Sequence, residues 1–163
     1  MGTRSTTTVY DEETPILSFY RQFDGYPSGH GQEVADFLTG KTIVNGIGAD
    51  DGTIFNGPGD LAVRLLAALK GDVDKAGALY CIPHDQAGDE DYHYDVVVTP
   101  PAGWGAEGTI VVKVKSYGTL IAVGSPEEFV ALAEARENDE SESVITVAGF
   151  VDSLVAGGGT NIV

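Results

Sequence analysis

The sequence predicts an α+β domain: an antiparallel β-sheet, made of an N-terminal hairpin plus a C-terminal meander, with about three to four helices packed on one face. Three observations lead to this prediction. Two runs that favour extended structure flank a polar, proline-ended loop near the N-terminus. Two later segments carry apolar residues at helical spacing, and the second half of the chain then changes to alternation with period two.

Residues 6–10 and 16–23 are the expected strands of the N-terminal hairpin. The first run is rich in β-branched residues, and the second alternates between apolar and polar side chains. Residues 11–15 between them are polar and end in Pro15, a composition typical of a hairpin loop. The chain is therefore expected to open with an antiparallel pair.

Two helices are predicted in the first half of the chain. Residues 32–38 place apolar side chains on one helical face, and Gly40 is suited to the left-handed position after the helix end. The second helix is expected to begin near Pro58, with Asp60 in its first turn, and to end at Gly71.

The meander is predicted from four strands, at residues 78–82, 92–98, 109–117 and 120–123. In the longer strands, apolar residues alternate with polar ones, as in Ile110-Val111-Val112-Lys113-Val114-Lys115. The strands follow one another through short links, so we expect each to pair antiparallel with the next.

A third helix is predicted after the meander, because Ser125 and Glu128 form a capping box. Residues 1–136 are expected to be a single domain. Residues 137–163 comprise an acidic linker followed by an apolar segment, residues 144–155, whose spacing is helical but whose β-branched content also allows a strand. This segment is a candidate contact with a partner or a second copy of the chain.

The charge balance excludes some classes of partner. The chain has 25 acidic residues against 9 Lys and Arg, a formal net charge of −16. Such a field repels nucleic acids and anionic membranes, so bulk nucleic-acid binding is not expected. A small anion in a local pocket remains compatible with the composition. The acidity itself indicates either a solubilising surface or a salt-adapted source.

Cysteine content and hydropathy indicate a soluble, cytoplasmic protein. Cys81 is the only cysteine, so neither an intrachain disulfide nor a thiolate metal cluster is possible, and its place in a strand pattern predicts a buried, inert thiol. Residues 1–8 are polar and lack the apolar core of a signal peptide. No apolar run approaches the roughly 18 residues expected of a membrane span.

The strongest candidate for a site is the segment 20–31, which gathers polar, aromatic and glycine residues before the first helix. Backbone N–H groups at a helix start can bind an anion, and an arginine can hold a phosphate or carboxylate with two hydrogen bonds. An aromatic ring there can stack on a base. The candidate ligand-binding residues are Arg4, Arg21, Asp24, Tyr26, Ser28 and His30.

A structural interpretation of the same segment stays open. In that interpretation the glycines serve only to make a turn, and Arg21 pairs with Asp24. Residues 45–59 form a second glycine-rich stretch before a helix, but they lack the Gly-Lys-Ser/Thr ending of a phosphate-binding loop. Capping of the second helix is the preferred interpretation there.

No metal, cofactor or catalytic residue is predicted. Residues 85–95 are rich in carboxylates, but their spacing matches no EF-hand loop, and the histidines lack zinc-ligand spacing. Ser28 and His30 lie close in sequence, but without the Gly-x-Ser-x-Gly pattern of a nucleophile elbow.

The segment Tyr-Arg-Gln-Phe-Asp-Gly-Tyr-Pro-Ser-Gly-His-Gly at 20–31, together with Thr-Arg-Ser-Thr at 3–6, resembles a widespread family of small phage and prophage proteins. The similarity extends through residues 43–47 and 56–57 to 125–129, and so spans roughly residues 3–130. The resemblance implies a phage origin and supplies no catalytic residues.

Small phage proteins commonly act by binding, and by that analogy we expect a non-enzymatic binding protein in the cytoplasm of an infected or lysogenic host cell. The expected partner is a small anionic or nucleotide-derived host-defence signal, or a host protein. A virion structural or assembly protein is the alternative, and a nucleotide hydrolase is the third hypothesis. Homo-oligomer formation is compatible with each.

Overall fold

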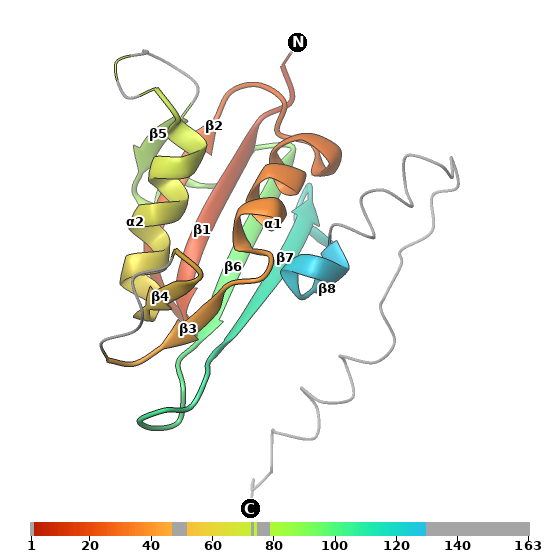
Figure 1. Cartoon of the computed structure of the whole chain (residues 1–163). Helices are drawn as coiled ribbons and strands as arrows, with labels where there is room; N and C mark the ends of the chain where they lie inside the picture. Colours follow the sequence, from red (N-terminus) through yellow and green to blue (C-terminus); the bar gives the residue numbers. More distant parts are fainter. Residues whose placement is uncertain (1, 47–51, 73, 75–78, 130–163) are drawn as a thin grey trace, which may run out of the picture.

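The computed structural model describes residues 2–46, 52–72, 74 and 79–129. The apolar segment 144–155, a candidate contact with a partner, lies outside these residues. Six strands form the main sheet, two more form a small second sheet, and α1 and α2 lie over one face of the main sheet (Figure 1). The predicted α+β class is confirmed.

The elements follow one another along the chain as β1 (Ser5–Asp11), β2 (Thr14–Arg21), a single π-helical turn η1 (Pro27–Gly31), α1 (Gln32–Leu38), β3 (Thr42–Val44), β4 (Ile54–Asn56), α2 (Gly57–Lys70), β5 (Leu79–Ile82), a short 3₁₀ turn η2 (His84–Gln86), β6 (Tyr92–Thr99), β7 (Thr109–Ser116) and β8 (Thr119–Gly124). Both predicted helices and the predicted hairpin are present within a residue or two of their expected bounds.

The main sheet has the strand order β5-β2-β1-β6-β7-β8. The hairpin β1–β2 and the meander β6–β7–β8 are antiparallel, as predicted. The two units join through β1 and β6, which run parallel with Ser5 opposite Tyr92 and Val9 opposite Val96. The sheet is therefore mixed rather than wholly antiparallel. Strands so distant in sequence leave no local sequence pattern from which their pairing could be predicted.

Strand β5 also departs from the prediction, since it leaves the meander and pairs antiparallel with β2. The chain must then return from the sheet edge to β6, and it does so behind β2 and β1, on the face opposite the helices (Figure 1). The contacts of His84 with Ser18 and with the ring of Tyr10 hold this connection against the sheet. The predicted short link from β5 to β6 is thus a crossover.

The edge position of β5 corrects the expectation for Cys81. This thiol was expected to be buried, but it is exposed, on a strand at the edge of the six-stranded sheet. Tyr80 beside it is also half-exposed. A strand pattern indicates whether side chains alternate, and the position of the strand in the sheet decides whether they are covered.

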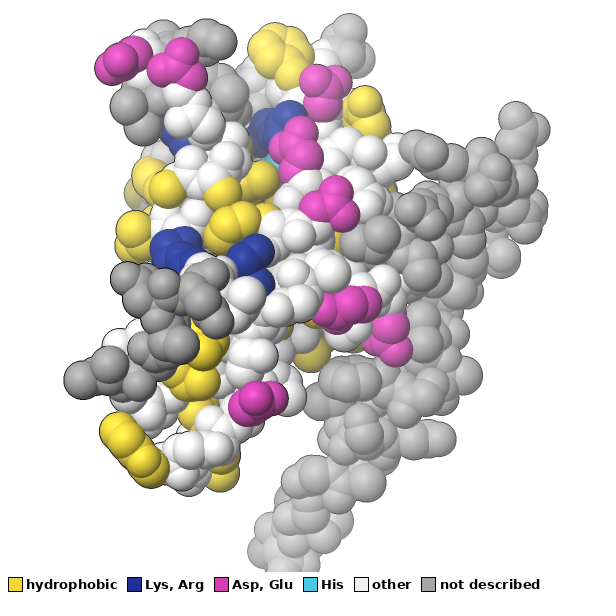
Figure 2. Space-filling view, viewed as in Figure 1, with side chains coloured by type: hydrophobic (Ala, Val, Ile, Leu, Met, Phe, Trp, Pro, Cys, Tyr) yellow, Lys and Arg dark blue, Asp and Glu magenta, His cyan; other side chains and the backbone are white. Residues whose placement is uncertain are grey.

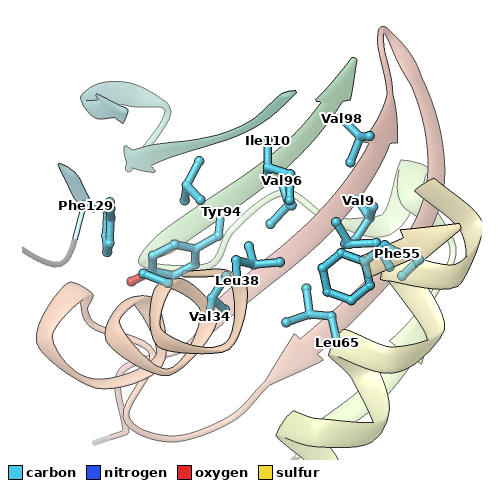
Figure 3. Close-up of a cluster of buried hydrophobic side chains, with 14 of the residues drawn as sticks. Val9, Val34, Leu38, Phe55, Leu65, Tyr94, Val96, Val98, Ile110 and Phe129 are labelled. Carbon is cyan, nitrogen blue, oxygen red and sulfur yellow. The ribbon is translucent and has the colours of Figure 1, made fainter. Parts of the chain in front are cut away.

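The core lies between the helices and the main sheet (Figure 3). Val34 and Leu38 of α1 lie beside Tyr94 of β6, a strand in the middle of the sheet, and Leu65 of α2 lies beside Phe55. Burial of such side chains contributes roughly 1.5–3 kcal/mol each. This apolar layer fixes where α1 begins, and therefore the position of the segment before it.

The predicted capping box after β8 is confirmed. The backbone N–H of Ser125 donates to Glu128 Oε2 (2.8 Å), and the Glu128 N–H donates to Ser125 Oγ (3.2 Å). The helical turn that begins at Pro126 places Phe129 in the core, where it is 2% exposed. Among the described residues, no helix is long and apolar enough to cross a membrane.

Candidate functional site

Arg21 stands at the end of β2 and reaches across to the start of α1. Its guanidinium forms an ion pair with Glu33 through both terminal nitrogens, and its Nε donates to the carbonyl of Phe23 (2.8 Å). A further contact joins Arg21 Nη1 to His30 Nδ1 (3.1 Å). Each of the three nitrogens of this arginine thus has a partner inside the chain, and its ion-pair partner is Glu33 rather than Asp24, the residue proposed in the structural interpretation.

His30 is fully buried beneath this pair. Its Nε2 lies 2.6 Å from Thr7 Oγ1, and its ring meets Tyr94 edge to face, with the centroids 5.3 Å apart. An arginine can only donate, so Nδ1 must accept from Arg21, and Nε2 must then carry the proton and donate to Thr7. The contacts define one tautomer of a neutral imidazole.

The electrostatics agree with this assignment. Burial, together with the neighbouring Arg21 charge, lowers the pKa of His30 from 6.5 to about 3. Burial also raises the pKa of the Tyr94 hydroxyl, which donates to the carbonyl of Gly25 (2.8 Å). Around neutral pH, the charged groups of this cluster are therefore the mutually paired Arg21 and Glu33.

The glycines of the segment are explained by close packing. A Cβ at Gly25 would lie 2.8 Å from the backbone N of Ser5, and one at Gly29 would lie 2.7 Å from the Asp24 carbonyl oxygen. A Cβ at Gly31 would lie 2.8 Å from the Tyr94 ring. None of the three adopts a positive φ. They let the chain pass close to β1 and to the core, and so form a tightly packed connection, which we call the β2–α1 corner (residues 21–33).

Three candidate residues of the corner face outward. Asp24 and Ser28 are exposed, and Tyr26 is 40% exposed. Asp24 has a φ of +57°, and its carbonyl accepts from the His30 N–H (2.9 Å), so its backbone holds the turn. Phe23, beside it, is 59% exposed. The outer surface of the corner is thus aromatic and polar, while its cationic group lies behind.

Arg4 is placed at a separate site. Its Nη2 donates to the carbonyl of Asp89 (2.7 Å), and its backbone N–H donates to Asp91 Oδ2 (2.7 Å). Tyr117 donates to the other oxygen of Asp91 (2.7 Å). The guanidinium of Arg4 is thus held by Asp89 and Asp91, and that of Arg21 by Glu33 and His30, so the two arginine side chains have different partners.

The second glycine-rich stretch is described only at its two ends, because residues 47–51 lie outside the described part of the chain. At the start of α2, Asp60 Oδ2 accepts from the Asn56 N–H (3.0 Å), which fits the predicted capping role. Arg64 donates to the carbonyls of Ile54 (2.6 Å) and Gly52 (2.9 Å). This arginine, like Arg21, secures a loop of its own chain.

Neither of two hydroxyl–imidazole pairs among the described residues has the geometry of nucleophilic catalysis. Both nitrogens of His30 are engaged by Thr7 and Arg21, so His30 is not available as a base for Ser28. Ser18 lies 3.3 Å from His84 Nδ1, but its side chain is buried. Within the described residues, no group of three or more His, Cys, Asp or Glu side chains is placed to hold a metal ion.

Sequence reasoning missed three members of the cluster around His30, namely Glu33, Thr7 and Tyr94. A usable signal existed for Glu33, because it lies three residues after His30 in the first turn of α1, where a carboxylate is favourable. Thr7 and Tyr94 reach His30 through the pairing of β1 with β6, which no local pattern indicates.

Comparison of the chain with models of protein families, with curated proteins and with solved structures finds no match. A functional proposal therefore rests on the geometry of the corner and its surroundings.

Proposed function

We propose that the protein is a non-enzymatic binding protein of phage type, acting in the host cytoplasm, whose β2–α1 corner contacts a host protein through Phe23 and Tyr26. One observation carries this proposal. The Arg21 guanidinium is already paired with Glu33 and His30, whereas the rings of Phe23 and Tyr26 on the same corner are exposed. Aromatic side chains held on a rigid support are the residues that most often dominate binding energy in protein interfaces.

Both rings are supported by the packing beneath them. A Cβ at Gly2 would lie 2.4 Å from the Phe23 ring, and one at Gly29 would lie 2.8 Å from the Tyr26 ring, so each ring rests directly on a glycine. A ring that is already positioned loses little conformational entropy on binding. These contacts favour a preformed contact surface.

A protein partner fits these contacts better than a small anion does. An anion would have to displace Glu33 from Arg21, and His30 would offer it no donor, because its Nε2 proton is given to Thr7. The helix-side face of the molecule also shows several carboxylate side chains and few Lys or Arg (Figure 2). A macromolecular partner that approaches Phe23 and Tyr26 need not break the ion pair.

Site-specific photo-crosslinking in host cells tests the proposal. A photoreactive phenylalanine analogue replaces Phe23, and in a matched control it replaces Trp104, which is 86% exposed on the β6–β7 connection. We expect the analogue at position 23 to crosslink one discrete host protein. This product should disappear when Tyr26→Ala is added, and the analogue at position 104 should not form it. Equal crosslinking at both positions, or none at position 23, would contradict the proposal.

A thermal-shift panel of nucleotides separates the anion hypothesis from this one. The protein-partner proposal predicts no shift in melting temperature with any nucleotide. A shift that appears in the natural chain and disappears in Arg21→Ala would instead favour sequestration of a small anionic signal. Chromatography of the same incubations would reveal any nucleotide hydrolysis.

A further inference from the structure

Strand β8 forms one edge of the six-stranded sheet, and among the described residues it pairs only with β7. Within the part of the chain that the structure describes, the backbone N–H and C=O groups on its outer side have no strand partner. Natural proteins protect such edges with charged residues, prolines, bulges or very short strands. A bulge at Ile121 interrupts the pairing of β8 with β7, but β8 has six residues and contains neither a charge nor a proline.

The absence of charge extends beyond the strand. Residues 116–126 carry no ionisable acidic or basic group apart from the Tyr117 phenol, in a chain whose net charge is −16. Two copies of so acidic a chain repel one another wherever carboxylates would meet. No residue of β8 itself carries a charge; the carboxylate of Glu128 lies beside Gly124 at the end of the strand, where it accepts from the Ser125 N–H, and at the other end Leu120 is 47% exposed.

The opposite edge of the sheet differs in the features that protect an edge. Strand β5 has four residues and is followed at once by Pro83, with Asp85 two positions later. Short length and proline both limit pairing with another strand. Of the two edges, β8 is the one suited to extend the sheet.

We infer that β8 pairs antiparallel with β8 of a second copy of this chain, about a two-fold axis. Antiparallel pairing of one strand with itself is self-complementary, so it closes a dimer rather than building a fibre. The pairing joins two six-stranded sheets into one continuous sheet. Because β8 and the β2–α1 corner use different residues, the dimer would carry two corners, each free to contact its own partner.

The first test measures the mass of the full chain by sedimentation velocity at roughly 1–100 µM, a range that spans the low-micromolar affinities of modest interfaces. We expect the mass to rise toward twice that of one chain. Leu120→Glu should shift the dimer dissociation constant upward by about tenfold or more, since it places like charges at the paired edges. Val63→Glu, an equal charge change at an exposed apolar residue of α2, is the matched control and should leave the mass unchanged.

Hydrogen exchange gives a second measurement that does not depend on a variant folding well. Amides of β8 should become more protected as the protein concentration rises, whereas those of β5 should not change. A chain that stays monomeric over the whole range overturns the inference. A dimer that persists in Leu120→Glu, with exchange at β8 independent of concentration, also overturns it.

Discussion

The two glycine-rich stretches that precede α1 and α2 look alike in sequence but differ in physical origin. Before α1, the glycines have ordinary negative φ values and are required because neighbouring atoms leave no room for a Cβ. At the start of α2, Gly57 has a φ of +78°, and a Cβ at Gly57 or Gly59 would point into open space; of the glycines that the structure describes in this stretch, only Gly46, at its far end, would bring a Cβ close to another side chain, 2.6 Å from the Trp104 ring. The first stretch is packed into the core, whereas the glycines at the start of α2 lie in open space.

Each stretch is also secured by an arginine, and the two arginines work in different surroundings. Arg21 pairs with Glu33 over a buried histidine, so its removal would leave an acceptor, His30 Nδ1, without its partner. Arg64 binds two carbonyls near the surface and lies over the Phe55 ring, 4.6 Å from its centroid. A conspicuous motif can therefore owe its composition to packing.

The largest effect is expected from His30→Ala. The change removes a fully buried side chain and leaves Thr7 without its donor, which should lower the free energy of unfolding by about 3 kcal/mol. Ser28→Ala, at an exposed position in the same corner, is the control and should change it by less than about 0.5 kcal/mol. Urea unfolding measures both. Equal effects would show that the corner is not packed as described.

Acidification should weaken the fold through the same histidine. Its folded pKa of about 3 lies below the unfolded value of 6.5, so the unfolded chain binds a proton that the folded chain does not. Stability is then fully present above pH 6.5 and falls toward pH 3, with a slope of up to about 1.4 kcal/mol per pH unit.

The carboxylates contribute in a lower pH window. Hydrogen bonds from the backbone N–H groups of Arg4 and of Gly40 lower the pKa values of Asp91 and Glu127 from their ordinary values of 3.8 and 4.5, so their contribution is present above about pH 4.5 and is lost as the pH falls below it. Urea unfolding between pH 7 and 4.5 therefore isolates the histidine. In His30→Gln, the free energy of unfolding should change less with pH in that range. An unchanged dependence on pH would show that other groups cause the loss of stability.

Glycine-to-alanine substitutions in the two stretches should have opposite effects. Gly31→Ala should cost about 1–3 kcal/mol, because the new methyl group overlaps the rings of Tyr94 and Phe129. Gly59→Ala should be neutral or stabilising by up to about 1 kcal/mol, since it adds a better helix former in open space. Thermal unfolding distinguishes the two directions. A lower melting temperature for both variants would contradict the difference in packing between Gly31 and Gly59.

The smallest difference is expected between the arginines. Arg21→Ala should lower the free energy of unfolding by about 1–2 kcal/mol, mainly because His30 Nδ1 is left buried without a donor. Arg64→Ala should cost about 0.5–1 kcal/mol, as its bonds lie near solvent. Chemical denaturation of the two variants side by side gives the comparison. A larger loss of unfolding free energy for Arg64→Ala than for Arg21→Ala would contradict this account.

Local patterns predicted the parts of this fold that depend on local physics. The β1–β2 hairpin, α1, α2 and the Ser125 capping box each follow from turn chemistry or helical spacing, and each is present. The pairing of β1 with β6 and the crossover from β5 depend on which distant strands meet, so alternation alone could not reveal them.

The same distinction applies to the candidate site. Sequence proximity suggested Asp24 as the partner of Arg21, but the turn at Asp24 directs its side chain outward while the first turn of α1 brings Glu33 to the guanidinium. The burial of His30 follows from a contact with Thr7 across the sheet, which no spacing within the motif encodes. The sequence pattern marked the turn before α1, whereas the partners of its residues depend on the tertiary contacts.

Nitrogen-15 NMR of the His30 imidazole as a function of pH would show whether the β2–α1 corner is closed. A neutral ring, protonated on Nε2 and accepting at Nδ1, should persist from pH 8 to about 4, because burial and Arg21 hold its pKa near 3. A ring that titrates near pH 6.5, or that carries its proton on Nδ1, would show that the corner is open instead.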